Sequence, residues 1–340
     1  MEEAKEVKMP MEVEYLKDEN VERLLTDNHQ YRKVIDKLLF IMTVTRPDIA
    51  AAVGILCRKV SAPSHHDWNA MAVDIFHNKE FSDAYQAGMI VDSPKIKNLI
   101  ISYLEEKKGK PFELAVDAGC GTGRSTRTLA PHFQKVIGID VSKSQISVAR
   151  KCTSHENISY QISPAEELPL EDASVDLINA GLAAHWFNPQ KFGLEAARVL
   201  KHGGCLALHS FSVVFEIEYK DKSEELTAAF SEALEILSDF NKKVVGEMKT
   251  MYPELFSAIP FKDKQRISGI REVFLLTVSE IMSFLQAMCL YKEFLEQDKD
   301  KATAFLQDLE KRLLDLLGES ASDVLLGFHV DYFCLLASKP

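Results

Sequence analysis

A glycine-rich stretch, Val116–Gly123 (Val-Asp-Ala-Gly-Cys-Gly-Thr-Gly), constrains the fold of this chain more than any other segment. An apolar run precedes it, and a polar run compatible with a helix follows from Arg124. The alternate glycines allow a sharp turn and a close approach to a ligand, because they carry no Cβ. The next helix would present unpaired N–H groups and a positive dipole end. The pattern predicts a strand, a turn and a helix that hold a nucleotide-like ligand at the carboxyl edge of a parallel sheet.

The glycine spacing narrows the choice of ligand. In the dinucleotide fingerprint G-x-G-x-x-G, the third glycine would fall at Arg124, whereas this chain has G-x-G-x-G with Asp117 two residues ahead. That arrangement resembles motif I of the class I S-adenosylmethionine-dependent methyltransferases, in which the loop contacts the methionine part of the cofactor. The resemblance implies that Asp117, Gly119, Gly121 and Gly123 bind S-adenosylmethionine. The alternatives are a nicotinamide-dependent dehydrogenase and a glycine turn without a ligand.

Composition and charge limit the partners and the compartment. The chain has 340 residues, and its net charge of −11 argues against a nucleic-acid partner held by phosphate contacts. No apolar run reaches the roughly 18 residues of a membrane span. The start, Met1–Lys5, lacks the features of a signal peptide. Six cysteines without a C-x-x-C pair indicate reduced thiols and no metal site. We expect a cytoplasmic protein without membrane or metal, and the oligomeric state stays open.

The N-terminal part differs from the rest of the chain. Residues 1–27 are polar and acidic, and we expect them to be disordered, whereas residues 28–75 have a helical pattern. This second segment resembles part of the polyprotein of copia-type retrotransposons. The matching residues are Tyr31-Arg32, Leu38-Leu39-Phe40, the run from Thr45 to Ala50, Ala52-Val53 and Trp68-Asn69-Ala70. The catalytic aspartates of the polymerase lie outside the fragment, so we expect no polymerase or nuclease activity and infer a transposon-derived exon or a mispredicted gene fusion.

Residues 76–340 form the second expected unit. The run from His77 to Tyr85 resembles the segment that precedes the core of small-molecule methyltransferases, where an aromatic residue folds over the cofactor. The resemblance implies that Tyr85 is such a lid, and the alternative is a surface helix with two buried aromatic residues. Ser93 and Pro94 are typical of a helix start, and Gly109 of its end.

Asp140 ends the second expected strand, Val136–Asp140. An acidic residue about 20 positions beyond a glycine loop suits a pair of ribose hydroxyls. The alternative is a helix cap, but Ser142 already supplies a cap, and Gln145 would complete a capping box. We therefore predict that Asp140 binds the ribose.

A loop follows the third expected strand, Ile158–Ile162. The family often has an acid before the alanine of this loop, and Pro164 stands in that place here. The resemblance implies that the backbone N–H of Ala165 contacts the adenine ring. Glu166 is then the acidic residue nearest to that ring. A solvated loop charge is the alternative for Glu166.

The fourth expected strand, Val175–Ala180, leads into residues 181–187. Their place at the carboxyl edge brings Leu182, His185, Trp186 and Phe187 beside the expected methyl group. The pair His185-Trp186 resembles the same position in methyltransferases of the trans-aconitate kind. The imidazole could orient or deprotonate a nucleophile, because its ordinary pKa is near neutral. A purely structural His-Trp pair is the alternative.

The remaining elements complete an expected core (93–212 and 320–340) and a helical cap (220–318). We expect a helix from Glu195 ended by Gly203-Gly204, a strand over 205–211, and a short strand or extended edge near 215–219. The cap should contain one long helix over 226–244, a helix after a Thr277–Glu280 capping box, and a helix over 305–316. The end, 327–337, reads as a strand pair that closes the sheet with an antiparallel strand.

The whole pattern predicts an α/β fold: a doubly wound, mostly parallel, Rossmann-like methyltransferase sheet with helices on both faces and a helical cap. A short helical N-terminal extension precedes it. From residue 76 onward, the chain resembles class I methyltransferases of the type 11 group, related to trans-aconitate methyltransferase. The resemblance implies in-line transfer of a methyl group from S-adenosylmethionine to a small-molecule acceptor, with a carboxylate as one option. The alternative is a catalytically inactive methyltransferase-like binding protein produced by a transposon-derived fusion.

Overall fold

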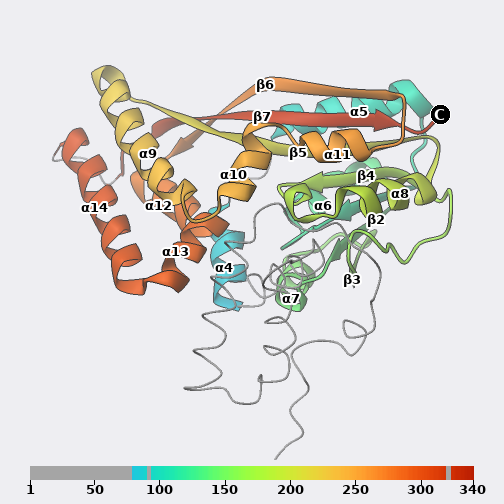
Figure 1. Cartoon of the computed structure of the whole chain (residues 1–340), viewed down its shortest axis with the longest axis horizontal. Coiled ribbons are helices and arrows are strands. Elements are labelled where there is room, and N and C mark those ends of the chain that lie inside the picture. The colour runs from blue at the N-terminus through green and yellow to red at the C-terminus, as the bar shows by residue number, and fades with distance from the viewer. Residues whose placement is uncertain (1–78, 90–92, 319–322) are drawn as a thin grey trace, which may run out of the picture. The chain divides into compact units, whose positions relative to one another are not determined.

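Seven strands form one sheet in the computed structural model, which describes residues 79–89, 93–318 and 323–340 (Figure 1). The strand order is β3-β2-β1-β4-β5-β7-β6. The strands are β1 (Leu114–Ala118), β2 (Lys135–Asp140), β3 (Ile158–Ile162), β4 (Val175–Gly181), β5 (Leu200–Glu218), β6 (Asp263–Leu276) and β7 (Leu326–Ser338). The described residues all lie in one unit that extends from Ile75 to Pro340. The predictions for residues 1–27 and for the retrotransposon-like segment lie outside them.

Strands β1 to β5 are parallel to one another, and β7 runs antiparallel to both β5 and β6. The prediction of a mostly parallel, doubly wound sheet with an antiparallel closing strand is confirmed. Strand β1 lies between β2 and β4, where the order of the strands reverses. In open α/β sheets, ligands bind outside the carboxyl ends of the strands at such a point. The glycine loop leaves β1 at this point.

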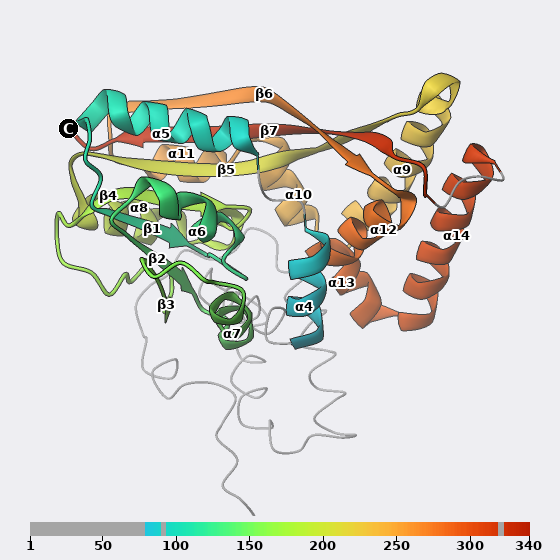
Figure 2. The same cartoon turned by 180° about the vertical axis from the view of Figure 1, so that it is seen from behind.

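Eleven helices of the described residues surround the sheet (Figures 1 and 2). They are α4 (Lys79–Gly88), α5 (Pro94–Lys108), α6 (Arg124–Leu129), α7 (Lys143–Lys151), α8 (Pro189–Val199), α9 (Ser223–Ser238), α10 (Lys242–Lys249), α11 (Pro253–Ala258), α12 (Val278–Ala287), α13 (Cys289–Gln297) and α14 (Lys299–Leu317). No helix of the described ranges is both long and apolar enough to cross a membrane.

Side chains alternate between the two faces of the sheet, as strand geometry requires. Ala115 and Ala207 belong to the core that α5 and α9 share with one face. Their chain neighbours Val116 and Leu206 belong to the core beneath α8 and α11. Both faces are therefore buried, which explains the continuous apolar runs that predicted these strands.

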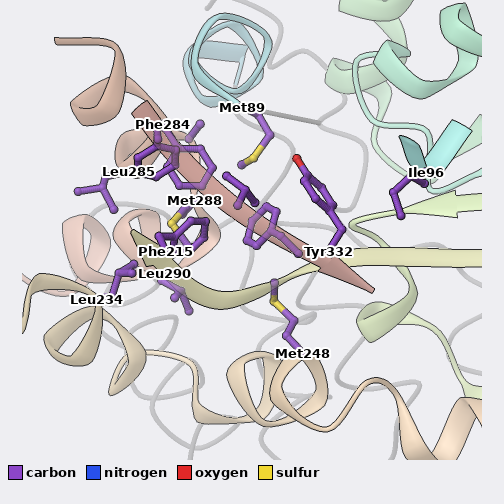
Figure 3. Close-up of a cluster of buried hydrophobic side chains, with 14 of the residues drawn as sticks. Met89, Ile96, Phe215, Leu234, Met248, Phe284, Leu285, Met288, Leu290 and Tyr332 are labelled. Atoms are coloured by element: carbon purple, nitrogen blue, oxygen red, sulfur yellow. The ribbon is translucent and has the colours of Figure 1, made fainter. Parts of the chain in front are cut away.

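The cap is built on a continuation of two strands. Strand β4 pairs with β5 only as far as His209, whereas β5 continues to Glu218 against β7. The helices α9, α12, α13 and α14 gather around this extension (Figure 1). Figure 3 shows part of the core there, where Phe215 of β5 and Phe284 of α12 have ring centroids 5.5 Å apart. The cap and the sheet thus share one apolar core.

Two helix boundaries differ from the prediction. The expected long helix over 226–244 is two helices, because the side chain of Asn241 accepts a hydrogen bond from the N–H of Val244 at 3.0 Å and starts α10. The helix expected to end at Gly203-Gly204 ends at Val199 instead, and both glycines lie in β5. Gly203 has φ +74°, so it serves an irregular start of that strand.

The strand predictions for the C-terminal half were also partly wrong. The short strand or extended edge expected near 215–219 is the end of β5, where β7 is its one strand partner among the described residues, because β4 pairs with β5 only as far as His209. The expected strand pair at the chain end is the single strand β7, and its edge partner is β6, which was not predicted. Strand β6 is exposed or half-buried along its length, so it lacks an apolar alternation that a sequence could reveal. The Thr277–Glu280 capping box is confirmed.

Candidate functional site

The glycine loop needs all three of its glycines. Gly119, Gly121 and Gly123 have φ values of +67°, +53° and +77°, which side chains rarely adopt. A Cβ on Gly119 would lie 2.4 Å from the Cβ of Ala183, and one on Gly123 would lie 2.2 Å from the Tyr160 hydroxyl. The loop therefore packs too closely for a side chain at Gly119 and Gly123, whereas Gly121 has the side chains of Gln145 and Tyr85 at van der Waals distance.

Asp140 reaches from the end of β2 to the middle of this loop. Its Oδ2 accepts the backbone N–H of Gly121, and its Oδ1 accepts that of Ser142, both at 2.8 Å. Burial raises the pKa of this carboxyl. Each carboxylate oxygen keeps a further lone pair, so both can still accept a hydroxyl proton from a ligand. The structure thus places Asp140 beside the loop, at the edge where the ribose is expected.

The capping box expected at the start of α7 does not form. The Oγ of Ser142 does accept the N–H of Gln145 at 3.2 Å, as a cap should. However, the N–H of Ser142 already donates to Asp140, so the Gln145 amide has no part in the box. Gln145 Oε1 and Thr122 Oγ1 are buried, and neither has a hydrogen-bond partner within the described residues. Both atoms are therefore candidate ligand contacts that sequence reasoning missed.

Tyr85 of α4 lies over the open part of the loop. A Cβ on Gly121 would be 3.9 Å from the Tyr85 ring. Two contacts hold the helix there: the hydroxyls of Ser82 and Ser144 are 3.0 Å apart, and Arg124 Nη1 donates to the carbonyl of Gln86 at 2.7 Å. The structure therefore brings the expected lid residue to the expected loop.

Asp117 supports the loop from inside the protein. Its carboxylate is buried and accepts the Thr126 hydroxyl at 2.6 Å and the Asn179 amide at 2.7 Å. Asn179 Oδ1 in turn lies 3.2 Å from His209 Nε2. Burial raises the pKa of Asp117 to about 6 and lowers that of His209 to about 4. The carboxylate thus links α6 to β1 and β4, and both of its oxygens have protein partners.

The loop after β3 begins beside Asp140, whose carbonyl accepts the N–H of Ser163 at 3.3 Å. Ala165 is buried within this loop. Glu166 Oε1 accepts the backbone N–H of Asn188 at 2.6 Å, and burial raises the pKa of this carboxyl. The structure thus uses Glu166 to join the loop after β3 to the loop after β4.

Leu182 marks the carboxyl end of β4. Its φ of +55° is left-handed, which is unusual for a bulky residue and is typical of functional sites. Its N–H donates to the carbonyl of His209 at 2.9 Å, and the next residue, Ala183, packs against Gly119. The turn therefore carries the chain from β4 directly onto the glycine loop.

His185 lies in the short 3-10 helix that follows, Ala184–Trp186. It is buried, and its Nδ1 lies 3.1 Å from the hydroxyl of Tyr252. Burial and the charge of Lys243 lower the pKa of His185 to about 3, so the ring is neutral at physiological pH. Tyr252 is 67 positions away in sequence, in the segment between α10 and α11, and no local signal could have revealed the pair.

The site therefore offers the backbone of the glycine loop, the Asp140 carboxylate with lone pairs to spare, the ring of Tyr85 and the neutral imidazole of His185. Across the described ranges, no group of three or more His, Cys, Asp or Glu residues is arranged to hold a metal ion. The arrangement suits an uncharged or cationic ligand with vicinal hydroxyls better than a pyrophosphate, because a carboxylate faces the loop.

Known proteins are similar in sequence to this part of the chain. Residues 116–208 match the family described as "Methyltransferase domain". A protein of Dictyostelium discoideum assigned as a methyltransferase is 39% identical over 120 residues, which cover 35% of this chain and 43% of that protein. A Saccharomyces cerevisiae protein assigned as an S-adenosylmethionine-dependent methyltransferase is 30% identical over 158 residues, covering 45% and 52%. The chain thus spans about half the length of these relatives.

The fold is shared with a solved structure from Anaeromyxobacter dehalogenans that is assigned as a type II methyltransferase. The TM-score is 0.56 at 21% identity, and the match covers 74% of this chain and 98% of the other. S-adenosylmethionine is the cofactor of the family, and the residues present fit it. Asp140 can accept hydroxyl protons, and two buried oxygens lack partners within the described residues. Residues 116–208 therefore match a methyltransferase-domain family, and the residues of the site fit S-adenosylmethionine as the cofactor.

Proposed function

We propose that the protein transfers a methyl group from S-adenosylmethionine to a small-molecule acceptor by direct in-line displacement. The observation that carries this proposal is the convergence of Asp140, Gly121 and Tyr85 at the carboxyl edge of the sheet. A carboxylate joined to an open glycine backbone beneath an aromatic ring suits a cofactor with a ribose and a cationic sulfur. The likeness of His185-Trp186 to the trans-aconitate group motivates a small acid as one acceptor class.

The binding roles follow from the positions. Asp140 accepts the ribose hydroxyls, and the backbone of Gly119, Gly121 and Gly123 holds the methionine part. Tyr85 covers the cofactor. The N–H of Ala165 meets the adenine ring. Asp117 and Glu166 act on the loops that carry these groups, because their carboxylates bond to other protein groups.

The cofactor supplies an electrophilic methyl group on a positively charged sulfur. The protein's contribution is alignment. Leu182 and His185 lie on the segment that packs onto the glycine loop, so an acceptor held there is close to the cofactor site. Holding two reactants in line removes a large entropic barrier, with effective molarities of about 10⁵ M or more. The pKa of His185 is about 3, so its ring is a weak base for a proton that leaves the acceptor. His185 is therefore better suited to orient an acceptor than to act as a general base.

Two other functions were open from the sequence. The matches to methyltransferases do not favour the catalytically inactive binding protein. They also give no support to a nicotinamide-dependent dehydrogenase.

The test is turnover with S-adenosylmethionine labelled in its methyl group. The full chain is incubated with matched sets of small alcohols, amines, thiols and carboxylic acids, and both labelled product and S-adenosylhomocysteine are measured. We expect a labelled product from at least one set and its loss in Asp140→Asn. The control is Glu167→Gln, which changes an exposed acid on the same loop system. Binding of the cofactor without any labelled product would support the inactive alternative.

A further inference from the structure

The first turn of α7 carries a buried amide oxygen that the protein itself does not use. Gln145 is 2% exposed, and its Oε1 has no hydrogen-bond partner among the described residues. Buried acceptors of this kind are rare in folded proteins, because an acceptor that is removed from water without a partner is destabilising. The backbone N–H of Gln145, by contrast, donates to the Ser142 hydroxyl at 3.2 Å. The side-chain oxygen is therefore a candidate contact for a ligand.

This oxygen lies against the middle of the glycine loop. A Cβ on Gly121 would be 3.8 Å from Gln145 Oε1 and 3.9 Å from the ring of Tyr85. The N–H of the same glycine donates to Asp140 Oδ2 at 2.8 Å. One glycine of the loop thus has an amide oxygen, a carboxylate oxygen and an aromatic ring as near neighbours.

A short hydrogen-bonded segment joins the two oxygens. Asp140 Oδ1 accepts the N–H of Ser142 at 2.8 Å, and the hydroxyl of Ser142 accepts the N–H of Gln145. The helix α7 begins within this segment. Side chains in a helix lean toward its N-terminus, so an amide in the first turn reaches back to the residues that precede the helix. The segment therefore holds Asp140 and Gln145 beside the same loop residue.

The two groups differ in what they leave for a ligand. Each oxygen of Asp140 keeps a further lone pair after its backbone bond, whereas Gln145 Oε1 keeps all of its accepting capacity. These oxygens accept and do not donate while the carboxylate is ionised, so a ligand beside them must supply the protons. The two hydroxyls of a ribose lie on adjacent carbons and supply two O–H donors. A vicinal diol therefore matches this pair of acceptors.

We propose that Gln145 is a second ribose ligand, whose Oε1 accepts a hydrogen bond from one hydroxyl of the cofactor ribose while Asp140 accepts from the other. The inference rests on the cofactor site of the proposed function and adds a specificity-determining residue to it. A cofactor that lacks the hydroxyl facing Gln145 leaves the amide oxygen buried without a partner. Sites built to bond a ligand hydroxyl discriminate against the analogue that lacks it, for this reason.

The test is a cycle of protein and ligand changes, measured by calorimetric titration of the full chain. The ligands are S-adenosylhomocysteine and its 2′-deoxy and 3′-deoxy analogues. Gln145→Met is compared with the unchanged protein, because methionine keeps the length of the side chain and removes the acceptor. Gln134→Met makes the same replacement at an exposed position and is the matched control.

We expect Gln145→Met to weaken the binding of S-adenosylhomocysteine about threefold to tenfold, and Gln134→Met to change it by less than about twofold. With the deoxy analogue that lacks the contacted hydroxyl, Gln145→Met should weaken binding no further, because the bond is already absent. Equal weakening for all three ligands contradicts the proposal. Unchanged affinity for S-adenosylhomocysteine in a folded Gln145→Met contradicts it as well.

A further ligand separates the ribose from the ammonium group, which also supplies protons. 5′-Methylthioadenosine keeps the ribose and the adenine but lacks the amino-acid part of the cofactor. We expect Gln145→Met to weaken this ligand by the same factor as S-adenosylhomocysteine. Weakening that is confined to S-adenosylhomocysteine would assign the Gln145 oxygen to the ammonium group and contradict the proposal.

A measurement on the unchanged protein covers the case in which Gln145→Met does not fold. The side-chain carbonyl of Gln145 is followed by carbon NMR in protein labelled with ¹³C-glutamine. Its resonance should shift on addition of S-adenosylhomocysteine and shift less with one of the two deoxy analogues, whereas equal shifts with all three ligands contradict the proposal.

The outcomes also separate this inference from the proposed function. Binding that follows the expected cycle without any methyl transfer overturns the proposed function and leaves the role of Gln145 standing. Methyl transfer with unchanged cofactor affinity in Gln145→Met overturns the inference alone. Absence of S-adenosylhomocysteine and S-adenosylmethionine binding in the unchanged protein overturns both.

Discussion

The Oδ2 atom of Asp140 accepts the backbone N–H of Gly121 at 2.8 Å, so the end of β2 is joined to the middle of the glycine loop. The same carboxylate accepts the N–H of Ser142 at the start of α7. One side chain therefore fixes the loop, the strand end and the helix start relative to one another. This pre-organised edge is the basis of the cofactor proposal, because a site that is ordered before binding loses less entropy on binding.

Replacement of Gly123 by alanine should destabilise the protein strongly. The residue has φ +77°, and a Cβ would lie 2.2 Å from the Tyr160 hydroxyl, which is itself bonded to Thr153 at 2.8 Å. We expect the free energy of unfolding to fall by about 2–5 kcal/mol, from backbone strain and overpacking together. Urea unfolding measures the change.

Gly246 offers a matched control for the same substitution. It lies within α10, and a Cβ there would meet nothing within 4 Å. Alanine should stabilise the helix by about 0.5–1 kcal/mol. If Gly123→Ala and Gly246→Ala shift the unfolding midpoint alike, the packing described for the loop is incorrect.

Removal of the Tyr85 ring should weaken the binding of S-adenosylmethionine. The ring lies beside the open face of Gly121, where it can cover the cofactor and face its cationic sulfur. We expect Tyr85→Ala to raise the dissociation constant about tenfold, and Tyr85→Phe to leave it within about twofold. Equal affinity in all three proteins, measured by calorimetry, would show that α4 has no role as a lid.

Asp117 should make the protein less stable as the pH rises. Burial raises its pKa from an ordinary 3.8 to about 6, so the folded state binds more protons than the unfolded state between these values. Stability attributable to this group is greatest below about pH 4 and falls as the pH rises to about 6, by roughly 3 kcal/mol. The Asp117→Asn variant lacks this dependence.

The comparison is made by urea unfolding of both proteins near pH 4 and near pH 7. The stability of the unchanged protein relative to Asp117→Asn should be about 2–3 kcal/mol more favourable at the lower pH. Other titrating groups contribute to both proteins and largely cancel in the difference. A difference that stays constant, or that grows in favour of the unchanged protein as the pH rises, contradicts this account of the network.

The sequence could predict the parts of the site that depend on local pattern. Apolar runs ended by glycine or an acid revealed β1, β2 and β4, and strand order then brought the glycine loop and Asp140 together. The resemblance of residues 77–85 to small-molecule methyltransferases placed Tyr85 near the loop. Each of these features lies within one short segment, so the residues of that segment are enough to predict it.

What the sequence could not predict depends on long-range contacts. The pairing of His185 with Tyr252 crosses 67 positions, and the roles of Asn179 and His209 depend on which face of neighbouring strands they share. Strand β6 lacks an apolar alternation, because Val273 and Leu275 on its exposed face are as apolar as Phe274 and Leu276 on the face that packs against the core. Asn241 divides a helix that has an uninterrupted apolar stripe, and only its capping bond shows the break.

The most direct test of the central claim is calorimetric titration of the full chain with S-adenosylmethionine, alongside Asp140→Asn and the control Glu167→Gln. We predict micromolar binding in the unchanged protein and in the control. We predict a loss of about tenfold to 100-fold in Asp140→Asn, because charge-assisted hydrogen bonds to the ribose are removed. Absence of binding in the unchanged protein, or equal affinity in Asp140→Asn, would contradict the cofactor site described here.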